Sequence, residues 1–311
     1  MDKILVAGID TVLGANLAAL LASRYTVVGL SWSAPIGIAG CETAVCEGQS
    51  TAAARDWVAA ERPQWIVHCG EAAQSSWHAP APAPRPEAVR TAGAWAKAAA
   101  EFAAEFTLVS SDALFTGPWM FHRETDAGLN DGAAARMIRM LEKEVAEANP
   151  AALIVRTNAF GWSPCAGRPG WVENILTAVQ NQEPLALDCM RHATPILATD
   201  FAELLEQAYQ RRLHGTWHLA GAERVNPFRF ACLLADEFGC SAASLEAVET
   251  ATAGRSVSAG ETSLQTHRLR KALESPFPLI REGLGRLYEQ FVSGYRDRFS
   301  TLALPVPEKV A

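Results

Sequence analysis

Short apolar runs alternate with longer segments of helical spacing in the first half of the chain. Residues 3–8 (KILVAG) form an apolar run that ends at glycine, which is typical of a buried parallel strand. Residues 13–23 follow with helix-forming residues and a broad apolar face, and residues 26–30 (TVVGL) form a second apolar run. This order predicts a βαβ unit, whose crossover is right-handed in almost all known cases.

The same alternation continues along the chain. Further strands are predicted at residues 65–69, 107–110 and 153–156, and helices at residues 88–106 and 133–148. Strands that alternate with helices in this way predict an α/β fold with a doubly wound, Rossmann-like parallel sheet. We expect that domain over residues 1–160, and a smaller lobe over residues 161–311, where the elements become shorter.

Residues 79–86 (APAPAPRP) form the one low-complexity stretch. Alternating prolines keep such a segment extended and leave it few backbone donors for a sheet. Two interpretations are open: a surface loop that leads into the next helix, or a segment that docks a partner protein.

Composition restricts the partners of this chain. Hydrophobic residues make up 49% and charged residues 20%, the net charge is -7, and only five residues are lysine. This balance argues against nucleic acid and anionic membranes, which both need a basic face. No apolar run approaches the roughly 20 residues of a membrane helix, and the N-terminus does not resemble a signal peptide. The seven cysteines lack a Cys-x-x-Cys pair, which predicts reduced thiols and a cytoplasmic protein.

Five segments share their pattern with one known family. They are residues 110–117 (SSDALFTG), 155–162 (VRTNAFGW), 194–200 (TPILATD), 215–221 (GTWHLAG) and 262–273 (TSLQTHRLRKAL). In this order and at this spacing they resemble the dTDP-4-dehydrorhamnose reductase branch of the extended short-chain dehydrogenases/reductases, over almost the whole chain. The resemblance implies NAD or NADP on the Rossmann half, a nucleotide-sugar between the lobes, and hydride transfer to a 4-keto sugar. It also implies that residues 194–221 return to the Rossmann core.

The glycine-rich loop of that family corresponds to residues 8–14 (GIDTVLG). Its first glycine permits a tight turn, its second lets the backbone approach a pyrophosphate, and its third lets the helix pack on the sheet. Thr11 replaces the second glycine and places a side chain near the phosphates, although amides at the helix N-terminus still favour an anion. The dinucleotide contacts expected in this loop are Gly8, Thr11, Val12, Leu13 and Gly14. Alternatively, the two glycines serve only the turn and the packing.

Three further positions complete the expected cofactor site: Ser31, Gly70 and Ser110. The second strand ends without the acid that holds the ribose of NAD or the base that holds the extra phosphate of NADP, so Ser31 is left as a ribose contact. The family's Asn-Ala-Ala segment is replaced by residues 68–71 (HCGE), where Glu71 would bring negative charge towards a pyrophosphate. Whether NAD, NADP or no dinucleotide binds stays open.

The family reduces its substrate with a tyrosine and a lysine four residues later, which share one helix face. Glu142 matches the acidic residue just after that motif, and this alignment places the pair at Ala134 and Ile138. No one-residue shift restores the pair, and Lys143 is turned well away around the helix. The resemblance therefore implies a chain that has lost the Tyr-Lys chemistry.

Other groups near this edge of the sheet are candidates for chemistry. Ser111 matches the family's third catalytic element, and either hydrogen-bonds a carbonyl oxygen or caps the strand end. Candidates for a substitute acid or base are Asp112, His122, Glu124 and Asp126, although Glu124 and Asp126 match a loop motif of the family. The histidines show no metal-ligand spacing, so we expect no metal site.

The second lobe offers three candidate substrate contacts. Trp162 and Trp171 flank a loop rich in Gly and Pro and either stack on a base or sugar ring or pack the loop. Arg191 is either a diphosphate contact or a surface arginine. Three functions stay open: a nucleotide or nucleotide-sugar binding pseudoenzyme, an NAD(P)-dependent reductase or epimerase with a substitute acid, and an interaction module that uses residues 79–86. The apolar spacing of residues 280–295 does not require a dimer, and the oligomeric state is not predicted.

Overall fold

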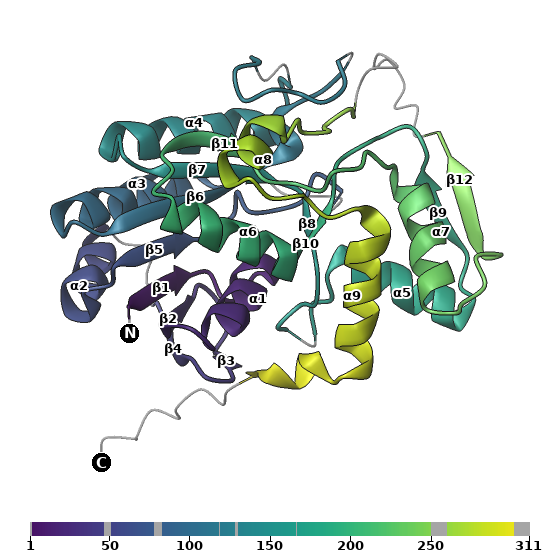
Figure 1. The fold of residues 1–311 in the computed structure, drawn as a ribbon, viewed down its shortest axis with the longest axis horizontal. Helices are drawn as coiled ribbons and strands as arrows, with labels where there is room; N and C mark the ends of the chain where they lie inside the picture. The colour runs from purple at the N-terminus through teal and green to yellow at the C-terminus, as the bar shows by residue number, and fades with distance from the viewer. Residues whose placement is uncertain are drawn as a thin grey trace.

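A computed structural model describes residues 2–46, 51–77, 83–117, 119–127, 130–165, 167–249 and 260–301. Within them, the central feature is a parallel sheet with strand order β11-β7-β6-β5-β1-β2-β4 (Figure 1). Its strands are β1 (Lys3–Ala7), β2 (Thr26–Ser31), β4 (Glu42–Val45), β5 (Trp65–His68), β6 (Glu105–Ser111), β7 (Leu153–Thr157) and β11 (Gly215–His218). This sheet confirms the predicted Rossmann-like α/β fold. Residues 79–82, the first half of the proline-rich stretch, lie outside the described residues.

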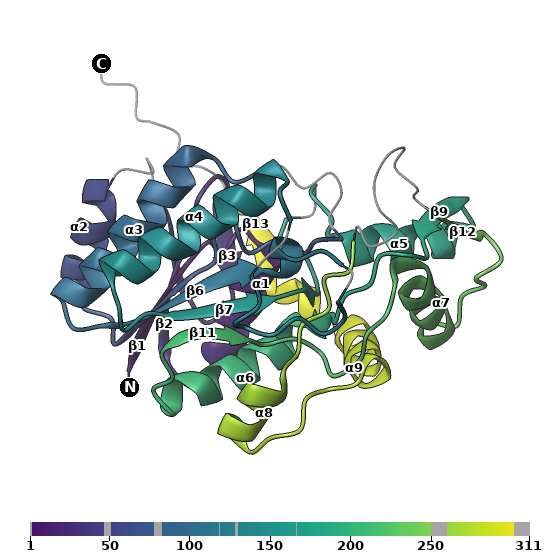
Figure 2. The same ribbon diagram turned by 90° about the horizontal axis from the view of Figure 1, so that it is seen from above.

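Helices cover both faces of the sheet. α2 (Thr51–Glu61), α3 (Pro86–Glu101) and α4 (Ala133–Ala148) lie side by side on one face (Figure 2), and α1 (Val12–Leu21) and α6 (Ala198–Gln210) cover the other. α8 (His267–Leu273) packs beside α6 and β11. Each face has its own apolar core, with Leu17 and Phe201 in one and Trp95 and Leu141 in the other. Because both faces are buried, the inner strands appear in the sequence as continuous apolar runs.

A smaller lobe lies at one end of this sheet (Figure 1). It contains α5 (Trp171–Asn181), α7 (Pro227–Glu237), α9 (Ile280–Val292) and the parallel pair of β9 (Leu185–Asp188) and β12 (Leu245–Val248). The short strands β8 (Ala159–Phe160) and β10 (Ile196–Leu197) pair with each other where the chain passes between the lobes. β13 (Phe299–Thr301) returns to the Rossmann half and pairs with β3 (Ile36–Ile38). The lobe has a third apolar core around Phe230 and Leu284.

Several elements differ from the sequence-based expectations, and three of them have a clear physical reason. α3 ends at Glu101, not at residue 106, because Ala103 adopts a left-handed backbone conformation with φ of 56° and the chain then enters β6. α9 ends at Val292, just before Gly294 with φ of 71°. The edge strand β4 was not expected, and its residues are partly or fully exposed, so it lacks the apolar run that marks a buried strand.

All seven cysteine thiols are free. Burial raises the pKa of Cys41 and of Cys69 to about 12, so both are protonated and act as small apolar groups near neutral pH. Among the described residues, no helix combines the length and the apolar character needed to cross a membrane.

Candidate functional site

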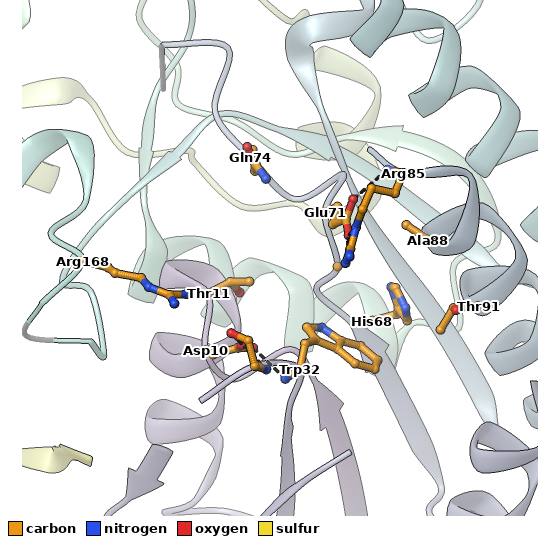
Figure 3. A pocket seen from close by; sticks show the side chains of 12 residues that line it. Asp10, Thr11, Trp32, His68, Glu71, Gln74, Arg85, Ala88, Thr91 and Arg168 are labelled. Carbon is orange, nitrogen blue, oxygen red and sulfur yellow. Dashed lines mark hydrogen bonds and ion pairs between the residues drawn. The ribbon is translucent and has the colours of Figure 1, made fainter. Parts of the chain in front are cut away.

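Two adjoining cavities form a groove beside the carboxyl ends of β1, β2 and β5. Their volumes are about 300 Å³ and about 480 Å³. Both are lined by Asp10, Thr11, Gln74 and Arg168, so these four side chains surround the junction (Figure 3). The strand order reverses between β1 and β5, and ligands of open α/β sheets bind at such a switch point. The groove is therefore the candidate ligand site.

Two glycines shape the loop that follows β1. Gly8 has φ of +104°, and a Cβ there would lie 1.9 Å from the carbonyl oxygen of Cys69. A Cβ on Gly14 would lie 2.1 Å from the carbonyl oxygen of Gly8. The turn and the close helix packing therefore require glycine at both positions, and neither residue lines a cavity.

Thr11 is the N-cap residue of α1, and its side chain leaves other amides of the helix N-terminus free. Its hydroxyl donates to the carbonyl of Gly8 at 2.7 Å and accepts from the amide of Gly14 at 3.0 Å. Within the described part of the chain, the amides of Val12 and Leu13 have no acceptor, and both residues line the larger cavity. The positive end of the α1 dipole therefore still faces the groove.

Arg168 faces the same helix end from the second lobe. Its side chain is exposed, makes no ion pair with any described residue, and extends towards Thr11 in Figure 3. Arg168 was not among the candidates predicted from the sequence, although it is the only basic residue between residues 161 and 171. An arginine here, opposite the free amides of α1, suits an anionic ligand group.

The smaller cavity has an aromatic wall. The Trp32 indole lies 5.4 Å from the His68 ring and 6.3 Å from the Trp95 ring, measured between centroids. Burial lowers the pKa of His68 to about 4, so its imidazole is neutral near pH 7. Ser31, the predicted ribose contact, is buried in β2, and its hydroxyl donates to the carbonyl of Ala44 at 3.3 Å.

The turn after β2 is bonded to the glycine-rich loop through Asp10. The Asp10 carboxylate accepts from the amides of Trp32 and Ser33 at 3.1 and 2.9 Å, and from the Ser33 hydroxyl at 2.8 Å. All three residues line the smaller cavity. The polar groups that this turn presents to the smaller cavity are therefore those of Asp10 and Ser33 rather than Ser31.

Glu71 does not present a free negative charge to the groove. Its carboxylate accepts from the backbone amide and from Nε of Arg85, both at 2.7 Å. Arg85 immediately precedes α3, and this ion pair closes one side of the smaller cavity. Gly70, the neighbouring cofactor position, lines the same cavity, and a Cβ there would lie 2.5 Å from the His68 ring.

Both serines at the end of β6 have partners in the fold. The Ser110 hydroxyl donates to Glu142 Oε1 at 2.6 Å, and Glu142 is paired with Arg156 at 2.7 Å. The Ser111 hydroxyl donates to the carbonyl of Gln74 at 2.6 Å and accepts from the amide of Ala113 at 3.0 Å. Neither serine lines a cavity of the groove.

Asp112 begins the 3-10 turn η1 (Asp112–Leu114) and is completely buried. It accepts hydrogen bonds from the Ser76 amide and hydroxyl at 3.0 and 2.7 Å, from Asn158 at 2.8 Å and from the Thr262 hydroxyl at 2.7 Å. Burial raises the pKa of Asp112, and these bonds only partly offset the rise. Through Oδ2, Asp112 therefore joins Ser76, Asn158 and Thr262, which come from three separate segments of the chain.

The positions aligned with the family's Tyr and Lys lie on α4. Ala134 is half-buried, whereas the Ile138 side chain is only 4% exposed and belongs to the apolar core under this face of the sheet. Lys143 is exposed and pairs with Glu147 at 3.7 Å on the outer face of the helix.

The other candidate acids and bases also have partners. His122 is buried, stacks on Phe115 at 4.5 Å, and its Nε2 lies 3.1 Å from the carbonyl oxygen of Glu261. The Glu124 carboxylate accepts from the His218 amide at 3.3 Å, and the Asp126 carboxylate accepts from the amide of Arg123, three residues before it. No cluster of three potential metal ligands occurs among the described residues.

The predicted substrate contacts separate into two groups. Trp171 lines the larger cavity, and its ring lies 5.3 Å from that of Trp77. Trp162 is buried against Phe291, and Arg191 pairs with Asp188 at 3.2 Å. Neither Trp162 nor Arg191 lines the groove.

The parallel sheet, the switch-point groove and the second lobe define a Rossmann-like α/β protein with a candidate ligand site between its two parts. The model of the family described as RmlD substrate binding domain matches residues 1–293, and the chain belongs to that family. A comparison with curated protein sequences finds no significant match.

Solved structures share the fold at low sequence identity. One is the dTDP-4-dehydrorhamnose reductase of Bacillus anthracis in complex with NADP, with a TM-score of 0.75 and 18% identity, over 93% of this chain and 99% of that one. The reductase of Yersinia enterocolitica has a TM-score of 0.71 and 19% identity, over 94% and 100%. The Bordetella bronchiseptica enzyme WbmH in complex with NAD+ has a TM-score of 0.74 and 15% identity, over 94% and 99%.

Proposed function

We propose that this protein is a pseudoenzyme that binds a nucleotide or nucleotide-sugar in the groove and carries out no reduction by the Tyr-Lys mechanism. The observation that carries the proposal is that, at one edge of the sheet, the groove is accessible to a ligand while the candidate catalytic residues are not. The groove is open and lined by ligand-binding groups, whereas Ser111 and Asp112 are bonded into the fold.

Each part of the groove suits one part of such a ligand. The Trp32 indole offers a flat face on which a base stacks. The free amides of Val12 and Leu13 and the guanidinium of Arg168 suit the phosphates. Trp171, in the larger cavity, suits the sugar or second nucleoside at the other end.

The same residues fit NAD or NADP, the cofactors named for two of the solved structures. Gly70 lines the smaller cavity without a side chain, and Thr11 turns its hydroxyl back towards the loop. A nicotinamide dinucleotide bound there would supply a hydride. Among the described residues, the two candidate proton donors Ser111 and Asp112 do not line the groove beside it.

Reduction of a ketone requires a proton donor within hydrogen-bond reach of the developing alkoxide. The Ser111 hydroxyl donates to the Gln74 carbonyl at 2.6 Å, and the Asp112 oxygens accept bonds from Ser76, Asn158 and Thr262. The position aligned with the family's lysine is a core isoleucine, Ile138. These contacts support binding without reduction.

The division into a Rossmann domain and a substrate lobe near residue 160 is part of the same proposal, because the groove lies between residues of both parts. We place the protein in the cytoplasm, a location supported by seven unpaired thiols.

Calorimetric titration of the full-length protein with NADH, NADPH, dTDP and UDP tests the proposal. We expect at least one of these ligands to bind, and we expect Trp32→Ala and Arg168→Ala to weaken it by about tenfold each. Arg229→Ala is the matched control, because Arg229 is an exposed arginine on α7 outside both cavities.

A turnover assay follows NADH or NADPH absorbance with a 4-keto nucleotide-sugar present. Binding without oxidation of the dinucleotide supports the pseudoenzyme. Steady oxidation that depends on the sugar would overturn it and assign a substitute acid, whereas the absence of any binding would overturn the groove as a nucleotide site.

A further inference from the structure

The carboxylate of Asp10 accepts three hydrogen bonds inside the groove. Both of its oxygens are engaged, Oδ1 by the Trp32 amide and Oδ2 by the amide and hydroxyl of Ser33. These three donors come from two consecutive residues in the turn that follows β2. Consecutive amides with an adjacent hydroxyl form a typical anion-binding turn, and here the chain fills it with its own carboxylate.

Among the described residues, Asp10 is the one charge on the Trp32 side of the groove that makes no ion pair. No lysine or arginine occurs between residues 25 and 54, so the turn itself carries no cation. Arg85, across the smaller cavity, is paired with Glu71. Arg168 borders both cavities, on the side opposite Trp32 and the aromatic wall in Figure 3.

Asp10 can still bind a neutral hydroxyl. A carboxylate offers about four acceptor sites, and three donors are present here, so one site is left. A ribose hydroxyl can donate a hydrogen bond to this remaining acceptor site. A phosphate in the same place would meet a like charge and would find the Ser33 donors already taken.

We propose that Asp10 makes the groove selective for nucleotides whose ribose hydroxyls are free. A nucleotide that carries a phosphate on the ribose bound in the smaller cavity is disfavoured. This inference rests on the proposed nucleotide site and adds the chemical class of its ligand. Among dinucleotides, it selects NAD(H) over NADP(H). The acid comes from the loop after β1, whereas the residue that makes this choice in Rossmann proteins usually lies at the end of the second strand.

Paired titrations with NADH and NADPH test this selectivity, because these ligands differ only by the 2′-phosphate. For the wild-type protein we expect NADH to bind at least about tenfold more tightly. Asp10→Asn and Asp10→Ala remove the charge, and we expect both to bring the ratio of the two dissociation constants close to one, chiefly through tighter NADPH binding. We also expect the wild-type ratio to fall as salt is raised, since salt screens the repulsion at this partly exposed site.

Glu101→Gln is the matched control. It removes one negative charge from an exposed ion pair with Arg55, outside both cavities, and we expect it to leave the ratio unchanged. Thermal unfolding of both Asp10 variants shows whether the turn keeps its fold, and Asp10→Asn, which keeps the side-chain size, decides the case if Asp10→Ala unfolds.

The outcomes separate this inference from the proposal on which it rests. Equal or tighter binding of NADPH by the wild-type protein would overturn the role of Asp10 and leave the nucleotide site intact. An unchanged preference for NADH in Asp10→Asn would do the same. If neither dinucleotide, nor dTDP, nor UDP binds, the nucleotide site and the selectivity both fail.

Discussion

The Asn158 side chain donates a hydrogen bond to Asp112 Oδ2 at 2.8 Å and so joins the residue after β7 to the turn after β6. The same carboxylate accepts bonds from Ser76, after β5, and from Thr262, in the C-terminal part of the chain. One buried carboxylate therefore connects four segments at the junction of the two lobes. A group in this position stabilises the shape of the groove without touching a ligand.

The exchange Asp112→Asn should lower the free energy of unfolding by about 2–4 kcal/mol, because the amide NH₂ would face donors and leave them unpaired in a buried site. Urea denaturation followed by tryptophan fluorescence measures the loss. Thr262→Val removes a single donor and should cost only about 1 kcal/mol. If Asp112→Asn keeps its stability but changes ligand turnover, Asp112 acts on the ligand instead.

Ile138 provides a direct test of the α4 alignment. The exchange Ile138→Lys should lower the free energy of unfolding by about 3 kcal/mol or more, because the charge would enter an apolar core. Glu142, four residues on, is already paired with Arg156 and offers no free partner. Met140→Lys is the matched control on the same helix, with a side chain that is 55% exposed. Equal stability of the two variants in urea would mean that Ile138 borders a pocket.

The fold was predictable because each inner strand is covered on both faces and so leaves an apolar run. β1, β5 and β7 were predicted within one residue of their ends, as was α4. β4 was missed, because an edge strand has partly exposed side chains and no such run. The boundary near residue 160 stays a prediction.

The residues that line the groove could be predicted where a loop of the backbone fixes their position. They could be predicted less well where packing between distant segments fixes it. Thr11 and Gly70 line the groove as expected from the loops that carry them. Ser31 does not, because β2 continues through it, and one residue along a strand moves a side chain to the opposite face. Which of Trp162 and Trp171 becomes buried depends on packing against α9, and the local sequence does not contain that information.

Glu173 holds both ends of the loop that carries Arg168. Its Oε2 accepts from the amides of Ser163 at 3.0 Å and Gly170 at 2.7 Å. We expect Glu173→Ala to free these amides and raise their hydrogen-exchange rates by about tenfold or more, and to weaken nucleotide binding by a similar factor as Arg168 loses its position. Glu173→Gln keeps an acceptor and should restore most of the protection. Unchanged exchange and affinity in Glu173→Ala would remove the loop from the binding site.

His68 should make stability depend on pH. Burial lowers the pKa of His68 to about 4, whereas an unfolded histidine titrates near 6.5. The unfolded state therefore binds more protons in between, so stability is fully present above about pH 6.5 and is lost as the pH falls towards 4. His68→Leu removes this contribution, up to about 1.4 kcal/mol per pH unit, and should flatten the curve of unfolding free energy between about pH 6.5 and pH 4.5. Exposed His214, exchanged for leucine, is the control. Parallel curves for wild type and His68→Leu would show that His68 has the same pKa in the folded and the unfolded protein.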